Sequence, residues 1–279
     1  MSDWPFETET RLAPADFLAG CGEVFATFDA RTQDSGNVSF GVETGGRRWF
    51  VKTAGDPESP AFLSHPERCA LLHNAARLAR DYAHEALPAL HAVGECGWGP
   101  MLIYDWANGD LVGARMAQRA NPTSAFQRFR RLPAAEIVSA LDTILDVHAG
   151  LCARGWVACD FYDGALIYDF AARRLTLIDL DSYHPGPFVN EMGRLFGSER
   201  FMAPEEFKEG ALIDERTTVF TLGRTMSVLL GDGTLAREAF RGTEAQHAAM
   251  AGACRADPDE RFRSVADLAS AWRADLRPR

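Results

Sequence analysis

The chain has 279 residues, of which 47% are hydrophobic and 24% are charged. This length and composition allow a substantial core in one two-lobed domain or in two small domains. No apolar run approaches the ~20 residues that a membrane-spanning helix needs. The first residues, MSDWPFETE, are acidic and lack the apolar stretch of a signal peptide. We therefore expect a cytoplasmic protein that does not bind membranes.

The charge and the cysteine pattern exclude further classes of protein. A formal net charge of −10 argues against nucleic-acid binding, because the release of counterions from phosphates requires a basic surface. The six cysteines include no C-x-x-C pair, so neither a zinc site nor a disulfide framework is predicted. We expect reduced thiols.

The first part of the chain predicts a small antiparallel sheet and one helix. Apolar residues at helical spacing predict the helix over 66–82. Aromatic and β-branched runs separated by turn residues predict strands. These runs lie at 22–30, 37–44, 47–53, 90–93 and 100–104.

The rest of the chain is mainly helical in pattern. The turn residues Asn108-Gly109-Asp110 end the strand-rich part, so we place a boundary near 107–110. Periodic apolar residues then predict helices at 134–154, 217–230 and 265–276, and short strands are expected at 166–170 and 175–179.

Three motifs in this second part carry chemistry. The run from His148 delivers Asp160, and Asp179 follows nineteen residues later, after the apolar run that begins at Leu175. The sequence FMAPE then ends at Glu205. In order and spacing, these motifs resemble the catalytic loop, the metal-binding Asp-Phe-Gly aspartate and the Ala-Pro-Glu motif of protein kinases.

The resemblance to the eukaryotic-like Ser/Thr kinase superfamily, in a divergent bacterial-type form, extends over about 22–273. It implies an α+β, two-lobed protein-kinase-like fold. A small antiparallel β-sheet lobe with one helix, 1–107, would bind the nucleotide. A larger, mainly helical lobe, 108–279, would carry the catalytic and acceptor-binding residues.

In the small lobe, the resemblance assigns Lys52, in WFVKT, to the strand lysine that grips the α- and β-phosphates. By pattern alone, Lys52 could equally be a solvent-facing strand residue. Glu67, fifteen residues later, is the candidate helix partner of Lys52. Asp105 and Ala107, at the lobe boundary, are expected to bind the nucleotide.

The phosphate-covering loop of kinases is eroded in this chain. Arg31, Gln33 and Gly36 stand where the family has three glycines, so Gly36 alone is kept as a nucleotide-binding residue. Backbone amides near Gly36 could still approach phosphate, because glycine tolerates the required turn. The Ser-Gly-Asn sequence there also resembles the loop of aminoglycoside-phosphotransferase-type kinases.

The resemblance assigns Asp160 to the catalytic aspartate that orients the acceptor hydroxyl. Ala158 and Cys159 replace the His-Arg that normally precedes it, and Thr218 replaces the helix aspartate that anchors this loop. The two replacements are consistent with each other, because without His-Arg the loop offers less for a helix aspartate to anchor. Without the arginine, phosphorylation at Ser182, Tyr183 or Ser198 is not expected to switch activity.

The metal ligands depart from the family pattern. Asp179 matches the principal magnesium ligand, but Ala165 stands where kinases have an asparagine ligand. Asp163 and Asp181 are the available substitutes, because Mg²⁺ prefers carboxylate oxygens. Aspartates clustered in loops are also common as solvated turn residues.

Two further matches concern structure. Glu205 and Arg261 correspond to the buried glutamate–arginine pair of the large kinase lobe, and Gly197-Ser198 stands where the family's acceptor-binding loop has Gly-Thr. These features are typical of protein kinases and not of aminoglycoside-type kinases.

The resemblance implies a phosphotransferase that uses Mg²⁺ and ATP or GTP and transfers the γ-phosphoryl group to a hydroxyl. A Ser/Thr protein kinase-like enzyme is favoured. The alternatives are a small-molecule O-phosphotransferase, such as an antibiotic-resistance kinase, and a pseudokinase that binds a partner without catalysis. The eroded glycine loop and Tyr162, where protein kinases place lysine, favour the first alternative, and Ala165 favours the second.

Overall fold

The computed structural model describes residues 4–31, 35–113 and 119–274. It is an α+β structure with a five-stranded antiparallel sheet and, among the described residues, seven α-helices. The chain divides into two compact units, residues 1–107 and 108–279. The sequence places a boundary near 107–110. Each unit is described by itself.

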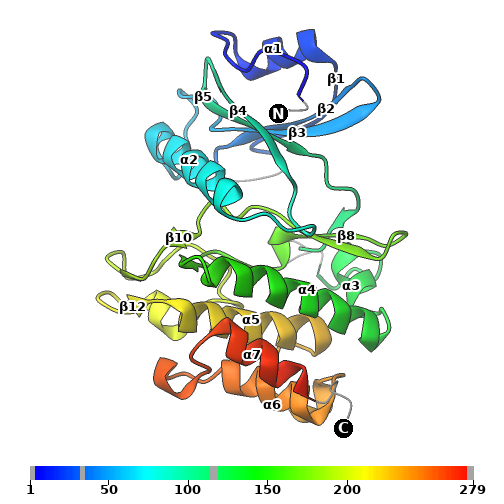
Figure 1. The fold of residues 1–279 in the computed structure, drawn as a ribbon, viewed down its shortest axis with the longest axis vertical. Helices are drawn as coiled ribbons and strands as arrows, with labels where there is room; N and C mark the ends of the chain where they lie inside the picture. Colours follow the sequence, from blue (N-terminus) through cyan, green and yellow to red (C-terminus); the bar gives the residue numbers. More distant parts are fainter. Residues whose placement is uncertain (1–3, 32–34, 114–118, 275–279) are drawn as a thin grey trace. The chain divides into compact units, whose positions relative to one another are not determined.

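The first unit is built on a sheet with strand order β1-β2-β3-β5-β4 (Figure 1). The helix predicted over 66–82 and the five predicted strands are confirmed, and a helix at 14–21 that was not predicted precedes them. The elements are α1 (Pro14–Cys21), β1 (Glu23–Phe28), β2 (Val38–Thr44), β3 (Arg47–Thr53), α2 (His65–Asp81), β4 (Leu90–Cys96) and β5 (Gly99–Asp105).

The two faces of this sheet carry different side chains because successive strand residues point to opposite sides. Trp49 and Val51 of β3 are buried in one cluster with Leu18 of α1. Ala54, just beyond β3, and Leu102 of β5 are buried in a second cluster with residues of α2. Helix α2 therefore covers one face of the sheet, as Figure 1 shows.

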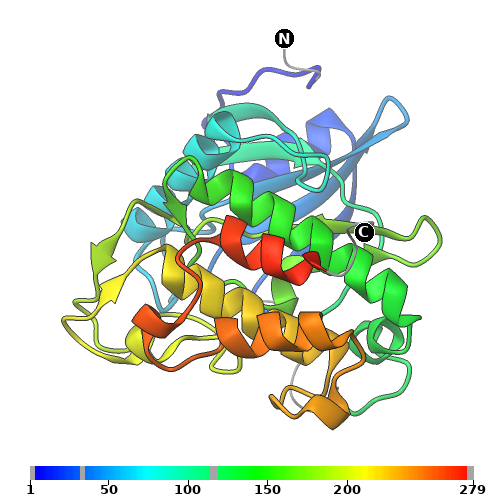
Figure 2. The ribbon, with the colours of Figure 1, turned by 60° about the horizontal axis from the view of Figure 1, so that its bottom comes forward.

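The second unit contains most of the helices (Figure 2). Its helices of eight residues or more are α4 (Ala134–Cys152), α5 (Glu215–Leu230), α6 (Glu244–Ala253) and α7 (Val265–Trp272). Its shorter elements are β6 (Asp110–Leu111), α3 (Ala125–Arg130), β7 (Trp156–Val157), η2 (Asp163–Ala165), β8 (Leu166–Asp169), β9 (Arg174–Leu177), β10 (His184–Pro185), β11 (Phe188–Val189), η3 (Pro204–Phe207), β12 (Leu212–Ile213), η4 (Arg237–Ala239) and η5 (Pro258–Glu260).

Helix α5 is the centre of this unit. It contacts α4, α6 and α7, and most of its side chains are buried. It begins at the N-cap Asp214, whose side chain accepts from the backbone N–H of Arg216. Ser264 caps α7 in the same way. Such caps satisfy backbone N–H groups that have no partner inside the helix.

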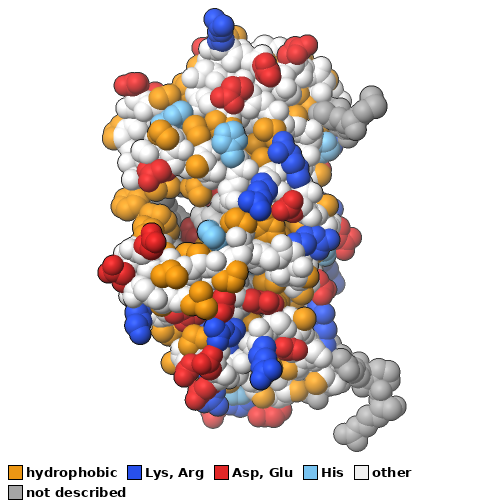
Figure 3. Space-filling model, turned by 60° about the vertical axis from the view of Figure 1, so that its left-hand side comes forward, with side chains coloured by type: hydrophobic (Ala, Val, Ile, Leu, Met, Phe, Trp, Pro, Cys, Tyr) orange, Lys and Arg blue, Asp and Glu red, His pale blue; other side chains and the backbone are white. Residues whose placement is uncertain are grey.

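The surface carries charges of both signs. On the face drawn in Figure 3, acidic and basic side chains of the second unit are interspersed with apolar ones. Within the described ranges, no helix is long and apolar enough to cross a membrane.

Candidate active site

The loop that delivers Asp160 is anchored from α5. The Oγ1 atom of Thr218 accepts a hydrogen bond of 3.0 Å from the backbone N–H of Ala158, and both residues are buried. Thr218, at the position of the helix aspartate, thus still anchors this loop, through its hydroxyl. A threonine hydroxyl has fewer acceptor lone pairs than a carboxylate, but enough to accept from this one buried N–H group.

Asp160 and Asp179 share an uncommon backbone conformation. Their φ angles are 56° and 61°, and the one other described non-glycine residue with positive φ is Arg173 in the β8–β9 turn. For residues with a Cβ atom, this left-handed region costs about 1–2 kcal/mol, although the short polar side chain of aspartate can offset part of that cost by local hydrogen bonding. Such strain concentrates at functional sites. The two aspartates singled out by the motifs are thus also two of the three positions with this strain.

The β8–β9 hairpin positions Asp179. Leu166 pairs with Leu177 in the ladder, and the backbone N–H of Ile178 extends it by donating to the carbonyl of Ala165 at 2.9 Å. Asp179 follows immediately and is exposed. Ala165 is 1% exposed, so position 165 offers a buried methyl group beside this strand end and no side-chain oxygen.

A buried hydrogen bond supports the segment after Asp179. Nδ1 of His148 lies 2.8 Å from the carbonyl oxygen of Ile144, and Nε2 lies 2.7 Å from the hydroxyl of Tyr183. A carbonyl can only accept, so Nδ1 carries the proton and the Tyr183 hydroxyl donates to Nε2. Burial lowers the pKa of His148 to about 4 and raises that of Tyr183 well above its usual value. The Tyr183 hydroxyl, a candidate phosphorylation site by sequence, is thus used inside the core.

The three candidate metal ligands have different surroundings. Asp163 is buried, and its carboxylate forms an ion pair of 2.5 Å with Arg200. Asp181 is also buried, whereas Asp179 is exposed. In the part of the chain that the structure describes, no three His, Cys, Asp or Glu side chains converge as a metal site. Magnesium would therefore need oxygen ligands from a nucleotide and water in addition to carboxylates.

Lys52 lies on the sheet face that carries α2. It pairs with Ser39 of β2 and Leu102 of β5, and Leu102 belongs to the cluster packed against α2. Lys52 is 8% exposed, so the alternative of a solvent-facing strand lysine is wrong. A buried ammonium group is costly unless negative groups compensate it.

Glu67, the candidate partner of Lys52, has another role in the structure. It is exposed, and its carboxylate accepts from the backbone N–H and the hydroxyl of Ser64 at 2.7 and 2.5 Å. These hydrogen bonds form the capping box of α2 and lower the pKa of Glu67. The assignment of Glu67 to the nucleotide site is corrected accordingly. The neighbouring Arg68 is the buried charge of this helix turn, at 1% exposed.

Gly36 is required by close packing. Its φ is 82°, and a Cβ atom on it would lie 2.4 Å from Cβ of Ala61 and 3.0 Å from the Arg68 guanidinium. Arg68 itself donates to the carbonyls of Ala54, Asp56 and Leu63. Gly36 therefore lies beside a fixed cation. The second aligned loop position, Gln33, lies outside the described residues.

Asp105 and Ala107 end the first unit. The Asp105 carboxylate pairs with Arg47 at 2.7 Å and His91 at 3.0 Å. Burial raises the pKa of Asp105, but the hydrogen bonds from Arg47 and His91 outweigh burial and leave the pKa below its usual value. Its side chain thus holds strand ends together, and Ala107 can offer only backbone groups to a ligand.

Four half-buried aromatic rings near the end of β3 were not predicted as site residues. The Phe25 and Trp106 rings meet edge to face at 4.8 Å, and Phe28 and Phe50 lie within 6.1–6.4 Å of Trp106 or of each other. Phe50 shares its sheet face with Lys52 because the two are separated by one residue. Aromatic faces can stack on a planar ring. The phenylalanine-rich pattern of the strands was the feature of the sequence that could have predicted this aromatic cluster.

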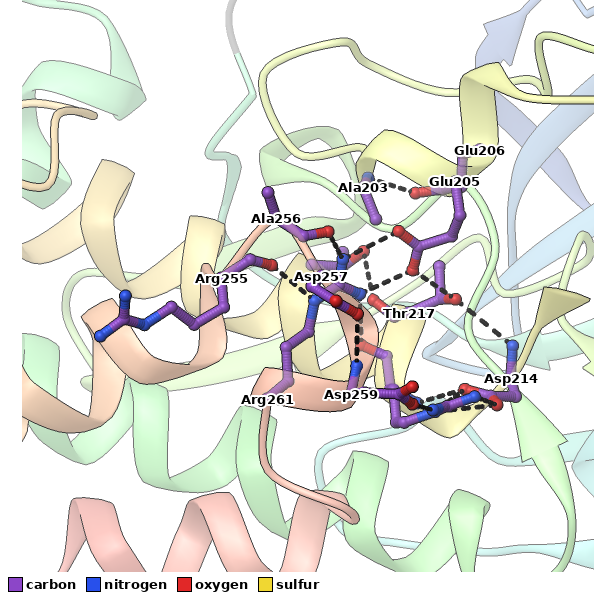
Figure 4. A network of polar contacts seen from close by, with 12 residues as sticks. Ala203, Glu205, Glu206, Asp214, Thr217, Arg255, Ala256, Asp257, Asp259 and Arg261 are labelled. Carbon is purple, nitrogen blue, oxygen red and sulfur yellow. Dashed lines mark hydrogen bonds and ion pairs between the residues drawn. The ribbon is translucent and has the colours of Figure 1, made fainter. Parts of the chain in front are cut away.

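The predicted Glu205–Arg261 pair is confirmed (Figure 4). The two guanidinium ends of Arg261 donate to the two carboxylate oxygens of Glu205 at 2.6 and 2.8 Å, across 56 residues of sequence. The remaining N–H groups of Arg261 donate to backbone carbonyls, and the hydroxyl of Thr217 donates to Glu205. Every charged oxygen and nitrogen of this buried pair has a partner, as burial requires.

Glu206, next in the chain, is a second buried glutamate beside this pair. Its carboxylate accepts from the backbone N–H of Ala203 at 2.6 Å. Burial raises the pKa of Glu206 to about 7, with a further contribution from the negative charges of Glu205 and Asp160. Sequence reasoning missed Glu206, because a glutamate within a loop gives no signal of burial.

Comparisons with known proteins give no assignment: no protein-family model matches the sequence, and no curated protein does.

Proposed function

We propose that the protein is a protein-kinase-like phosphotransferase that moves the γ-phosphoryl group of ATP or GTP to a hydroxyl of a protein acceptor. Asp160 would accept the proton of the acceptor hydroxyl and orient its oxygen. Asp179 would bind magnesium, with Asp181 as a second carboxylate. Magnesium, when bound, would neutralise charge on the phosphates.

The strained conformation of Asp160 and Asp179 is the observation that carries this proposal. Two of the three described non-glycine residues with positive φ stand at the two motif aspartates. Aspartate tolerates this region better than most side chains, so the support comes from its coincidence with both motif positions. The Glu205–Arg261 pair supports the same resemblance independently, because it joins two distant motifs of the same family.

The first unit supports nucleotide binding through Lys52 and the aromatic rings on its sheet face. A buried lysine provides a fixed cation for phosphate. The attraction between the two charges is stronger in the low dielectric of a buried site. The rings of Phe25, Phe28, Phe50 and Trp106 would contact the base by stacking. Stacking does not distinguish adenine from guanine, so both nucleotides would bind.

The surface after Asp179 favours a protein acceptor over a small molecule. Of the nine exposed large hydrophobic side chains in the described residues, five lie between residues 189 and 212. They are Val189, Met192, Phe196, Phe207 and Leu212. Val189 and Leu212 are partners across the β11–β12 pair, and apolar side chains that are exposed together form protein contact surfaces. Phe196 is the chain neighbour of Gly197, and a Cβ atom on Gly197 would lie 3.7 Å from a carboxylate oxygen of Asp160.

A binding module without catalysis is the second candidate, and Ala165 is the observation that favours it. A buried methyl group occupies the position of a metal ligand, and three convergent ligands are not found among the described residues. Labelled ATP or GTP with magnesium, offered alone and with mixed protein and small-molecule acceptors, separates the candidates. Label on protein supports the proposal. Label only on a small molecule would mean that the acceptor is a small molecule and not a protein. Nucleotide binding without transfer supports the binding module.

A further inference from the structure

An ion pair connects the catalytic loop to the segment that precedes Glu205. The carboxylate of Asp163, three residues after Asp160, accepts from Nη2 of Arg200 at 2.5 Å. The two residues are 37 positions apart, and the side chains are 3% and 28% exposed. A carboxylate this buried is strongly destabilised without a cation beside it. The pair therefore fixes where Arg200 lies.

Arg200 is held from two further directions. Its backbone carbonyl accepts from Nε of Arg224 in α5 at 2.9 Å. Its guanidinium lies 5.0 Å from the ring of Phe201 and 5.7 Å from that of Phe126. A guanidinium over aromatic faces gains cation–π stabilisation and loses freedom. Residues on α3, on α5 and in η2 thus converge on one arginine.

The charges of this pair are placed the opposite way round from the contact that protein kinases make between a catalytic-loop arginine and a phosphate on the later segment. The residue before Asp160 is Cys159 and not arginine, so the catalytic loop offers no cation for a phosphate. It offers instead the anion of Asp163, and the cation comes from the later segment. Such a pair needs no modification to form.

We propose that the Asp163–Arg200 pair is a permanent latch that holds residues 194–206 beside Asp160, in place of a phosphate-dependent contact. This inference rests on the proposed function for its regulatory meaning. A Cβ atom on Gly197, within the latched segment, would lie 3.7 Å from the Asp160 carboxylate, so release of Arg200 would displace backbone close to Asp160. Asp163 is then a positioning residue, and the magnesium ligands reduce to Asp179 and Asp181.

Hydrogen exchange of the full chain tests the latch without requiring activity. Arg200→Met removes the cation, Asp163→Asn keeps the shape and one oxygen acceptor, and the double variant measures their coupling. We expect Arg200→Met to raise amide exchange in residues 194–206 at least tenfold, Asp163→Asn to raise it less, and the double variant to match Arg200→Met. Protection of α5 amides reports that the fold is intact. If Arg200→Met does not fold, Arg200→Lys replaces it, with an intermediate increase expected.

Arg194→Met is the matched control. Arg194 lies in the same segment and is exposed. Among the described residues, its side chain contacts the carbonyl of Gly197 at 3.5 Å and the ring of Phe207 at 5.6 Å. Its substitution should change exchange less than twofold.

Three results would overturn the latch. The first is exchange in 194–206 within twofold of wild type in Arg200→Met with α5 still protected. The second is a higher magnesium requirement for nucleotide binding in Asp163→Asn but not in Arg200→Met, which would make Asp163 a metal ligand. The third is increased exchange after phosphatase treatment of freshly purified protein. Increased exchange in Arg200→Met together with an inactive wild type would keep the latch and reject the proposed function.

Discussion

Backbone strain at Asp179 can be separated from its proposed chemistry. Asp179 and Arg173 have φ angles of 61° and 54°, and glycine adopts this region without the Cβ penalty. Asp179→Gly and Arg173→Gly should each leave the free energy of unfolding within about 1 kcal/mol of wild type, because relief of strain offsets the greater freedom of the unfolded chain. Only Asp179→Gly should eliminate magnesium-dependent nucleotide binding. Calorimetric titration with and without magnesium measures this, and unchanged binding in Asp179→Gly would remove Asp179 from the metal site.

Glu206 gives a pH-dependent prediction. Its pKa rises from 4.5 in the unfolded chain to about 7 in the folded protein, so the folded state binds more protons between these values. The stability contribution of Glu206 is therefore present below pH 4.5 and is lost as the pH rises toward 7. Glu206→Gln keeps an oxygen that accepts from Ala203 but does not ionise.

Chemical unfolding of both proteins at pH 5 and pH 8 measures this effect. From pH 5 to pH 8, the variant should gain about 2 kcal/mol relative to wild type. An equal difference at the two pH values would show that Glu206 keeps an ordinary pKa.

At the residue scale, the sequence predicts which residues belong to the candidate site better than it predicts their burial and backbone conformation. The motifs single out Asp160, Asp179 and Lys52, because the order and spacing of motifs can be read directly from the sequence. Burial of Lys52 and the strain at Asp160 depend on strand pairing and loop closure. Those are set by contacts between residues far apart in the chain.

Helix α5 contacts the loop that carries Asp160 through one hydroxyl. In Thr218→Val, the buried N–H of Ala158 loses its acceptor, which should cost about 1–3 kcal/mol of unfolding free energy. Turnover should fall by roughly tenfold, because Asp160 is positioned two residues later. Denaturant unfolding and steady-state rates provide the two measurements.

Thr225→Val is the control for this prediction. Thr225 is buried in the same helix, but its hydroxyl donates to the carbonyl of Thr221 one turn earlier and to no loop. Its substitution should leave turnover within about twofold. Equal losses in both variants would mean that the hydroxyl of Thr218 stabilises the helix and not the loop.

The start of α2 illustrates a limit at the element scale. The helix itself is predictable from its apolar period, and Ser64 with Glu67 three residues later is a capping-box pattern. The sequence contains this capping-box pattern, but the resemblance to kinases assigned Glu67 to the nucleotide site instead. Local capping is satisfied within four residues, whereas the family pairing requires a longer-range contact, so the local interaction determines where Glu67 points.

At the scale of the whole molecule, one long-range ion pair could be predicted from the sequence and another could not. Glu205 and Arg261 were paired from sequence because both belong to motifs with a known relation. Asp163 and Arg200 belong to no such relation, and the segment that carries Arg200 has little regular structure. Its position follows from the sum of turns, caps and packing, which no periodicity reveals.

Asp160 and Asp179 are proposed to perform phosphoryl transfer, and this can be measured directly. The most direct test incubates purified wild type, Asp160→Asn and the exposed control Asp232→Asn with magnesium, labelled ATP or GTP and a mixture of protein acceptors. Wild type and Asp232→Asn should transfer label to protein, whereas Asp160→Asn should bind nucleotide with nearly unchanged affinity and transfer none. Transfer by Asp160→Asn at the wild-type rate would contradict the account, as would a wild type that binds magnesium nucleotide and transfers label to no acceptor.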